Sequence, residues 1–248
     1  MPALPGGSLA PVLVFVHGGW WKAAYTLDYG GHFCEALRKA GIATWSLEYR
    51  RFGEDGGGFP GTFEDVAAGF DFLTELAKLH PLDLKRVVVA GHSAGGHLAF
   101  WLAGRPQIPQ SSVLYSPPPY PSIQAVVGLA GAVDLRMTID HAGQEEFAHI
   151  RDEVTNFMGG APAEFPERYA AGNPGELVPL NVPQLLIQGT EDDQIPAQLP
   201  LRWAERGRLC GEEIVVDVLE GADHLDVVDP LSKIWPQVEA AIVRLIEG

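Results

Sequence analysis

The chain has 248 residues, of which 46% are hydrophobic and 20% charged, and it carries a formal net charge of −15. This length and composition predict one globular domain, 1–248, with a sizeable hydrophobic core. The acidic balance excludes nucleic acid and an anionic membrane surface as partners, because both repel a negatively charged protein.

The first residues contain no basic side chain ahead of the first apolar run, which argues against a secretory signal. No apolar stretch reaches the roughly 18 residues that a membrane span needs. The two cysteines, Cys34 and Cys210, lie far apart in the sequence and form no metal-binding pattern. We therefore expect a cytoplasmic protein with reduced thiols and with no metal or other cofactor.

Short β-branched runs alternate with helical patterns along the chain. The predicted helices lie near 27–40, 62–79, 94–104, 198–208 and 232–247. The predicted strands lie at 12–17, 42–48, 86–91, 125–130, 184–189 and 214–219. This alternation predicts an α/β fold with a doubly wound, mostly parallel sheet of about six strands. Such sheets place their binding sites at the carboxyl ends of the strands.

One long segment, 131–183, interrupts this alternation between the fourth and fifth predicted strands. Part of it, 143–158, has helical spacing with these apolar residues on one side: Phe147, Ile150, Val154, Phe157 and Met158. Insertions over the carboxyl ends of strands often form lids, so we predict a small lid-like insertion. The alternative is a plain surface excursion.

The strongest local signal is the segment GHSAG at 91–95, which follows the apolar run RVVVA and precedes GHLAFWLAG. A G-x-S-x-G pattern between a strand and a helix is typical of a sharp turn that lifts a serine hydroxyl above the sheet. The positive end of the following helix faces the same spot. We therefore predict that Ser93 is a catalytic nucleophile, the alternative being an ordinary glycine-rich turn.

A serine hydroxyl is a weak nucleophile near neutral pH and needs a base. His224 is the predicted base because it lies in a loop after the last strand, at the carboxyl end of the sheet. The other downstream histidines lie in the helix after the serine or in the insertion: His97, His141 and His149. The acid that orients the base is expected after the preceding strand, where three carboxylates remain open: Glu191, Asp192 and Asp193.

Together these motifs resemble the α/β-hydrolase superfamily, and within it the esterase and lipase group that includes carboxylesterases, acetylxylan and feruloyl esterases, and arylformamidases. The resemblance covers nearly the whole chain, because VLVFVHGGWW, GHSAGGHLA, LLIQGTEDDQIP and GADHLDVVDP follow one another in family order. It implies a Ser-His-Asp triad. The family pattern G-x-x-D-x-x-[VI]-P falls on Gly189, Asp192, Ile195 and Pro196, which implies Asp192 as the acid.

The resemblance also implies an oxyanion hole made by the backbone N–H groups of Gly19, Trp20 and Ala94. The loop HGGWW at 17–21 fits the HGG-x-W pattern that is typical of arylformamidases, whereas many esterases read HGGG. Trp20 would then stack on an aromatic part of the substrate or narrow the pocket to formyl or acetyl size. Nearby side chains are expected to form the pocket walls: Trp21, Tyr25, Tyr49 and His92.

We therefore expect a metal-free serine hydrolase that cleaves small-molecule carboxylic esters of small acyl groups through an acyl-enzyme. One alternative is an arylformamidase that hydrolyses an N-formyl aromatic amine, an amide substrate. An alternative of another class is a catalytically inactive ligand-binding relative, against which the presence of Ser93, Asp192 and His224 argues.

One departure from the family pattern concerns the start of the sheet. The superfamily has two strands before the HGG strand, and only 1–11 precede it here. The first two family strands are therefore expected to be missing, which would make 42–48 an edge strand. Because bare edges invite pairing, we expect this edge to be covered by the N-terminal segment or by a second copy of the chain in a homodimer.

Overall fold

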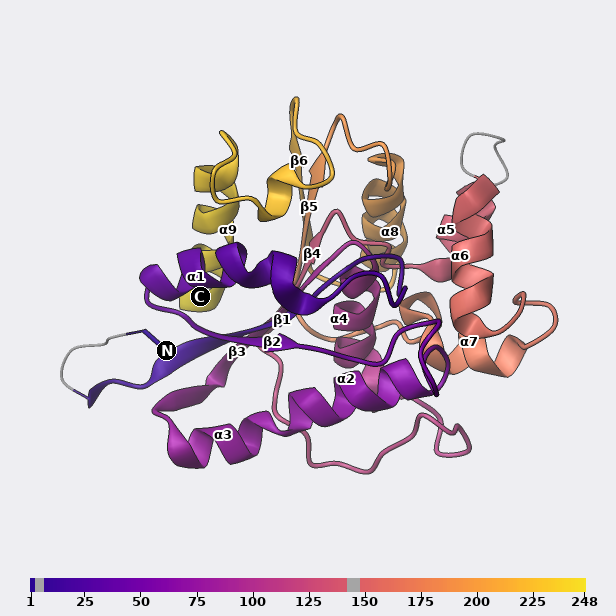
Figure 1. The fold of residues 1–248 in the computed structure, drawn as a ribbon, viewed down its shortest axis with the longest axis horizontal. Coiled ribbons are helices and arrows are strands. Elements are labelled where there is room, and N and C mark those ends of the chain that lie inside the picture. The colour runs from indigo at the N-terminus through magenta and orange to yellow at the C-terminus, as the bar shows by residue number, and fades with distance from the viewer. Residues whose placement is uncertain (3–6, 142–147) are drawn as a thin grey trace.

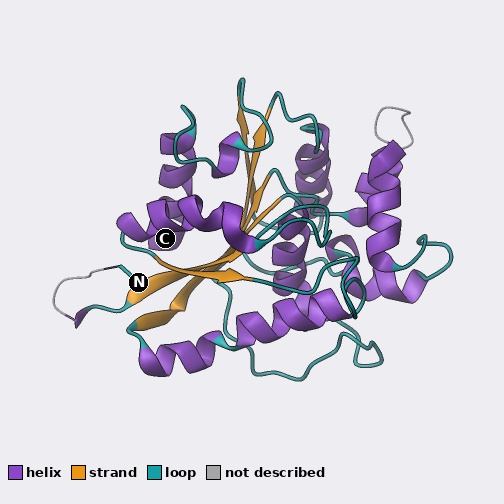
Figure 2. Ribbon diagram, in the orientation of Figure 1, coloured by secondary structure: helices purple, strands orange, loops and turns teal. Residues whose placement is uncertain are grey.

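The computed structural model describes residues 1–2, 7–141 and 148–248. Its single sheet has six strands in the order β2-β1-β3-β4-β5-β6, and every neighbouring pair is parallel (Figures 1 and 2). The strands are β1 (Ala10–Val16), β2 (Ala43–Leu47), β3 (Leu82–His92), β4 (Ala125–Leu129), β5 (Gln184–Gly189) and β6 (Ile214–Leu219). The predicted six-stranded α/β fold is confirmed.

The α-helices are α1 (Gly31–Lys39), α2 (Gly61–Asp71), α3 (Leu73–Leu79), α4 (Ala94–Gly104), α5 (Leu135–His141), α6 (Ala148–Met158), α7 (Pro166–Gly172), α8 (Gln198–Leu209) and α9 (Trp235–Glu247). Two of the predicted helices are divided. The segment predicted at 27–40 begins as the 3₁₀ turn η2 (Leu27–Gly30) and becomes α1 at Gly31, the second of two successive glycines. The segment predicted at 62–79 is broken at Phe72 into α2 and α3.

The inner strands of the sheet are buried on both faces, which is why they are almost continuously apolar, whereas the edge strands β2 and β6 are partly exposed. In β1, Val14 belongs to the core on one face and its neighbour Phe15 to the core on the other. The first core receives side chains from α2, α4 and α8, and the second from α1 and α9. Helix α4 is buried along its whole length. It therefore lies at the centre of the molecule, directly behind the turn that carries Ser93.

The insertion at 131–183 folds into α5, α6 and α7 at one side of the molecule (Figure 1). The helical spacing predicted there is confirmed by α6, whose buried side chains include Ile150, Val154, Phe157 and Met158, while Phe147 lies outside the described residues. Phe157 stacks on Trp21 with ring centroids 4.6 Å apart. The insertion therefore packs against the loop that follows β1, and its role as a lid stays a prediction.

Strand β2 forms one edge of the sheet, as expected from the family order. Among the described residues no strand pairs with its outer side. Trp45 of this strand instead reaches across to α2, where its indole N–H donates to the carbonyl of Gly69 at 2.9 Å. That a second copy of the chain or the N-terminal segment covers this edge stays a prediction, which the mass of the protein on size exclusion will test.

Cys34 and Cys210 are not joined by a disulfide in this structure. None of the helices in the described ranges is long and apolar enough to cross a membrane. Over the same ranges, no group of three or more His, Cys, Asp or Glu side chains is placed to hold a metal ion.

Candidate active site

Ser93 stands on the sharp turn between β3 and α4 that the G-x-S-x-G pattern predicts. Its backbone angles are φ 54° and ψ −121°, a conformation that residues other than glycine rarely adopt. The glycine two residues later is required by close packing, because a Cβ on Gly95 would lie 2.1 Å from the carbonyl oxygen of Val16. The turn thus holds Ser93 in a strained backbone conformation at the carboxyl end of the sheet. Such strained residues are often found at functional sites.

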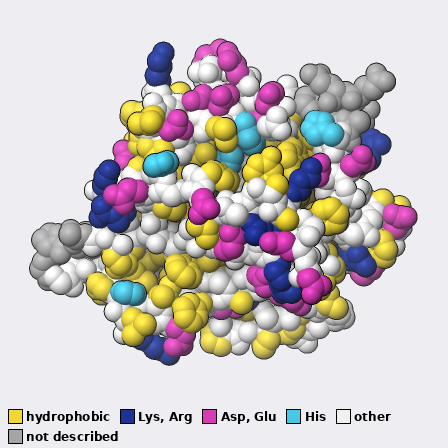
Figure 3. All heavy atoms as spheres, in the orientation of Figure 1, with side chains coloured by type: hydrophobic (Ala, Val, Ile, Leu, Met, Phe, Trp, Pro, Cys, Tyr) yellow, Lys and Arg dark blue, Asp and Glu magenta, His cyan; other side chains and the backbone are white. Residues whose placement is uncertain are grey.

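A cavity of about 700 Å³ opens over this turn, between the loops that follow β1, β3, β5 and β6. Both Ser93 and His224 line it. The remaining lining residues are Gly19, Trp20, Tyr25, Tyr29, His32, His92, Glu191, Asp193, Gln194, Asp223, Leu225, Val228, Asp229 and Pro230. Figure 3 shows acidic side chains along the top of this face, where the loops after β5 and β6 lie. The cavity has the position that open α/β sheets reserve for ligands.

Asp192 is the carboxylate that binds His224. Nδ1 of His224 lies 2.8 Å from Oδ2 and 3.0 Å from Oδ1 of Asp192, whose side chain is fully buried. Burial would raise the pKa of Asp192, but the hydrogen bonds from His224 and from two backbone N–H groups outweigh it and lower that pKa. The carboxylate therefore stays ionised, and of the three candidates in the sequence it alone is placed to orient the imidazole.

The loop after β1 contributes two residues, Gly19 and Trp20, to the lining of the cavity. Gly18 approaches the serine so closely that a Cβ added to it would lie 2.8 Å from Cβ of Ser93. Its own N–H donates to the hydroxyl of Tyr29, whereas the N–H groups of Gly19 and Trp20 meet no acceptor in the described chain. Ala94 opens α4, where the first N–H groups have no partner within the helix. These three N–H groups are the ones implied for the oxyanion hole.

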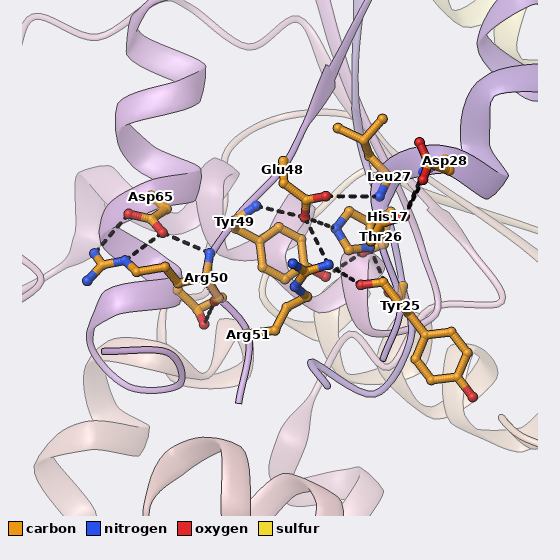
Figure 4. Close-up of polar contacts among 12 residues, drawn as sticks. His17, Tyr25, Thr26, Leu27, Asp28, Glu48, Tyr49, Arg50, Arg51 and Asp65 are labelled. Atoms are coloured by element: carbon orange, nitrogen blue, oxygen red, sulfur yellow. Dashed lines mark hydrogen bonds and ion pairs between the residues drawn. The ribbon is translucent and has the colours of Figure 1, made fainter. Parts of the chain in front are cut away.

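His17 anchors this loop from outside the cavity (Figure 4). It follows β1 as Glu48 follows β2, and the register of the two strands sets the residues side by side. Its Nε2 lies 2.9 Å from Oε1 of Glu48, and its Nδ1 lies 2.8 Å from the carbonyl oxygen of Gly18. Tyr49 stacks on the imidazole at 4.3 Å and donates its hydroxyl to the carbonyl of His17. These bonds fix the path of the chain into the glycines.

Two arginines hold the neighbouring loops in the same way (Figure 4). Arg51 donates to Glu54 at 2.8 Å, lies 3.4 Å from Glu48, and donates to the carbonyl of Tyr25. Arg50 makes a bidentate pair with Asp65, with both distances 2.8 Å. Arg51 thus holds the loop that contains Tyr25, whereas the pair of Arg50 with Asp65 ties the segment after β2 to α2.

The structure separates the four side chains that we expected in the pocket walls. Tyr25 and His92 line the cavity, but Trp21 and Tyr49 do not. The backbone φ is positive at both tryptophans of the loop, at 53° and 54°, and their rings meet edge to face with centroids 6.3 Å apart. Trp20 lines the cavity, whereas Trp21 is fully buried against α6. Tyr49 is instead the buried partner of His17 described above, so both expectations for these two residues are corrected.

Two polar side chains at the site carry no signal in the sequence. Tyr29 lies in η2, and its hydroxyl contacts both the loop after β1 and His92. Gln188 lies near the end of β5, and its Nε2 donates to Oδ2 of Asp192 at 2.7 Å. Tyr29 belongs to no motif and is brought to the site by packing, because His92 lies 63 positions away in the sequence. Gln188 lies within the segment LLIQGTEDDQIP, four positions before Asp192, but the family pattern gives it no role.

The family of the chain can be assigned from most of its length. The BD-FAE family model matches residues 1–203, which carry the serine turn, the loop after β1 and the acid. The chain belongs to the BD-FAE family. Together with the six-stranded parallel sheet, this confirms the resemblance to esterases of the α/β-hydrolase type.

Among curated proteins, this BD-FAE chain is 27% identical to the probable isoprenylcysteine alpha-carbonyl methylesterase ICMEL1 of Arabidopsis thaliana, over 96% of the chain and 50% of the relative. It is 29% identical to Esterase LipC of Mycobacterium tuberculosis, over 92% of the chain and 55% of the relative. The chain thus spans about half the length of these relatives. Nothing in their names supports the arylformamidase alternative.

Among solved structures, the chain is similar to Esterase B from Lactobacillus rhamnosis, with a TM-score of 0.80 and 18% identity over 97% of this chain and 76% of that one. It is also similar to an esterase of Thermogutta terrifontis, Est2, with a TM-score of 0.72 and 20% identity over 99% of this chain and 86% of that one. These similarities establish the α/β-hydrolase fold.

Proposed function

We propose that this chain is a carboxylic ester hydrolase that acts on esters of small acyl groups through Ser93, His224 and Asp192. The observation that carries the proposal is the arrangement at one cavity. Ser93 and His224 both line it, and His224 is bound through Nδ1 to a buried carboxylate. With Nδ1 committed to Asp192, the other ring nitrogen remains to act as the base.

In the proposed reaction, Oγ of Ser93 attacks the ester carbonyl carbon while Nε2 of His224 takes the hydroxyl proton. The tetrahedral intermediate collapses when its bond to the leaving oxygen breaks, and His224 gives the proton to the departing alcohol. Water then attacks the acyl-serine, again losing its proton to His224, and the carboxylic acid leaves as Ser93 regains its proton.

The developing oxyanion would be held by the N–H groups of Gly19, Trp20 and Ala94. Two observations support this role: the first two groups meet no acceptor in the described chain, and the loop lies against the serine. Each donor aimed at the oxyanion is worth about 3 kcal/mol in related hydrolases. The preference for small acyl groups is supported by aromatic walls, since Trp20, Tyr25 and Tyr29 all line the cavity.

The experiment that tests this proposal compares the wild-type protein with Ser93→Ala on p-nitrophenyl acetate, butyrate and octanoate, a methyl ester and a feruloyl ester. We expect turnover of the shorter esters to be fastest, and Ser93→Ala to lose at least about 1,000-fold in kcat. Ser122→Ala is the matched control, because Ser122 is exposed in a loop away from the cavity and should keep wild-type activity. Full activity in Ser93→Ala would overturn the assignment.

Two further arms separate this proposal from the alternatives. A fluorophosphonate probe should label the wild-type protein at Ser93 and leave Ser93→Ala unlabelled. An inactive ligand-binding protein would not be labelled even in its wild-type form. Hydrolysis of an N-formyl aromatic amine is measured beside the esters. If the formyl amide were turned over faster than every ester, the arylformamidase alternative would replace the proposal.

A further inference from the structure

A chain of hydrogen bonds that the triad does not use crosses the floor of the cavity. The N–H of Gly18, in the loop after β1, donates to the hydroxyl of Tyr29. That hydroxyl lies 3.0 Å from Nδ1 of His92, the residue before the serine. Nε2 of His92 lies 2.9 Å from the backbone carbonyl oxygen of His224. Three loops that meet at the cavity are therefore joined through two side chains.

The groups at the two ends of this series of hydrogen bonds, the N–H of Gly18 and the carbonyl of His224, determine which partner donates in each bond. A carbonyl oxygen can only accept, so Nε2 of His92 must carry the hydrogen that it donates to His224. A neutral imidazole carries one hydrogen, which leaves Nδ1 as an acceptor for the hydroxyl of Tyr29. The oxygen of Tyr29 then accepts the N–H of Gly18. Only one arrangement of hydrogens satisfies all four groups.

The surroundings keep both side chains neutral. Burial and then the charge of His224 lower the pKa of His92 to about 3, so its ring has a single hydrogen at neutral pH. Burial raises the pKa of Tyr29, so its phenol keeps the proton that it donates. The arrangement of hydrogens described above is therefore the one expected at neutral pH.

We propose that Tyr29 and His92 are positioning residues that lock the loop carrying the oxyanion N–H groups to the loop carrying His224, across the serine turn. This inference rests on the proposed esterase function. The bond at the carbonyl of His224 fixes the backbone from which the imidazole projects, and the bond at Gly18 fixes the residue before Gly19. A displacement of about 1 Å at such a site can cost about 100-fold in rate.

His92 also lies beside the imidazole that must become charged. The ring centroids of His92 and His224 are 4.7 Å apart. With its only hydrogen directed at the carbonyl of His224, His92 adds no positive charge when His224 takes the proton of Ser93. A side chain that was cationic at this place would oppose that step.

The two ring nitrogens of His92 can be tested one at a time. In His92→Asn the side-chain oxygen can take the place of Nδ1 and accept from Tyr29, but nothing reaches the carbonyl of His224. In His92→Gln the amide nitrogen can take the place of Nε2 and donate to that carbonyl, but the acceptor for Tyr29 is lost. Each variant therefore breaks one half of the chain of hydrogen bonds.

Tyr29→Phe is then measured in three backgrounds with p-nitrophenyl butyrate. We expect it to lower kcat about tenfold, with KM changed less than about threefold, in the wild-type and His92→Asn backgrounds. In the His92→Gln background we expect a further loss of less than about twofold, because the bond from Tyr29 is already broken. An equal loss in all three backgrounds would show that the hydroxyl of Tyr29 acts without His92, through its bond to Gly18 alone, and would overturn the inference that the two loops are locked together.

Tyr169→Phe is the matched control. Tyr169 is a fully buried tyrosine whose hydroxyl donates to the backbone carbonyl of Gly160 at 3.0 Å, and it lies outside the cavity, whereas Tyr29 is half-buried and lines it. It should lower stability by a similar amount while leaving kcat at the wild-type value. A loss of kcat in Tyr169→Phe equal to that in Tyr29→Phe would also count against positioning.

A second measurement does not depend on activity. Nitrogen chemical shifts should show His92 as the tautomer with hydrogen on Nε2, and amide exchange at Gly18 should be at least about tenfold faster in Tyr29→Phe than in the wild type. If the wild-type protein hydrolysed no ester but these signatures were present, the esterase proposal would fail and the hydrogen-bonded chain would stand. The other tautomer, or unchanged exchange at Gly18, would overturn the inference.

Discussion

The carboxylate of Asp192 faces Nδ1 of His224 with both of its oxygens, at 2.8 and 3.0 Å. The same carboxylate accepts the side-chain N–H of Gln188 and the backbone N–H groups of Gln194 and Ile195, at 2.7, 2.8 and 2.8 Å. Four donors from two elements therefore fix its orientation. Because a carboxylate only accepts, the hydrogen of a neutral His224 is held on Nδ1 and away from the serine.

Asp192→Asn tests this relationship. An amide group has one acceptor atom instead of two and presents N–H groups where donors already point, so it favours the wrong tautomer of His224. We expect kcat on p-nitrophenyl acetate to fall on the order of 1,000- to 10,000-fold, as when such an acid is replaced in other serine hydrolases. Circular dichroism should show an intact fold.

The neighbouring variant Asp193→Asn provides the comparison for Asp192→Asn. The carboxylate of Asp193 bonds the side chain of Gln194 and does not contact His224. It should keep more than about a tenth of the wild-type kcat, since it supplies no group to the reaction. Losses of the same size in both variants would refute the assignment of the acid.

The packing of Gly18 against the serine leads to a second prediction. A methyl group at this position would lie 2.7 Å from the carbonyl oxygen of His92 and 2.8 Å from Cβ of Ser93. Gly18→Ala must therefore push the loop away from the serine and carry the N–H groups of Gly19 and Trp20 out of reach. We expect kcat/KM to fall at least about tenfold, because misplaced donors no longer stabilise the transition state.

Gly31→Ala is the control for Gly18→Ala. Gly31 begins α1 with ordinary helical angles, φ −60° and ψ −41°, and a Cβ there would meet nothing within 4 Å. Alanine should be accepted at this position and should raise stability by about 0.4–1 kcal/mol. Wild-type kcat/KM in Gly18→Ala would show that the loop can move without cost and would contradict the geometry described here.

Much of this site could be predicted from the sequence because it is built from local patterns. Ser93 lies in a turn that requires glycines at fixed positions, and His224 follows the last strand in a fixed order. Both residues can therefore be recognised from the sequence alone. The choice of Asp192 over its two acidic neighbours came from the family pattern. Here the structure supplies the physical reason, which is that this carboxylate alone is buried against the histidine.

The residues that the sequence misplaced are those whose roles depend on tertiary packing. Trp21 follows Trp20 directly, and only tertiary packing decides that Trp20 lines the cavity while Trp21 is fully buried in the core. Tyr49 contacts His17 because β1 pairs with β2, and its hydroxyl donates to the carbonyl of His17. Tyr29 reaches the site from η2, and no spacing rule connects it with His92, which lies 63 positions away.

The charge of the cavity gives a third prediction. Four carboxylates line it, Glu191, Asp193, Asp223 and Asp229, and no lysine or arginine does. Within the described chain, none of the four forms an ion pair. An ester with a cationic leaving group should therefore be favoured over an uncharged one of the same shape, and an anionic one disfavoured.

The comparison uses butyrylcholine, its uncharged carbon isostere and the butyryl ester of glycolic acid. We expect kcat/KM to fall about three- to tenfold at each step in that order at low salt, and the steps to shrink at high salt because ions screen exposed charges. Asp193→Asn should reduce the first step, whereas Glu205→Gln, on the exposed side of α8, should not. Equal kcat/KM for the three esters at low salt would refute the prediction.

Buried histidines predict how stability depends on pH. His97 lies fully buried in α4, with Nε2 2.7 Å from the carbonyl oxygen of Gly172. Burial lowers its pKa to about 4, although this hydrogen bond acts in the opposite direction. In the unfolded chain a histidine takes up a proton near pH 6.5. Between these values the unfolded state binds a proton that the native state does not, so the free energy of unfolding falls as the pH falls.

His97→Gln isolates the contribution of this one group. The amide nitrogen of glutamine can still donate to Gly172, but it does not titrate. Going from about pH 7 to about pH 5, the free energy of unfolding measured with urea should fall less in His97→Gln than in the wild type, by on the order of 2 kcal/mol. His80→Gln, which changes an exposed histidine after α3, should show the full wild-type decrease. If His97→Gln and the wild type lost the same free energy, His97 would have to take up its proton in the native state, which its buried position opposes.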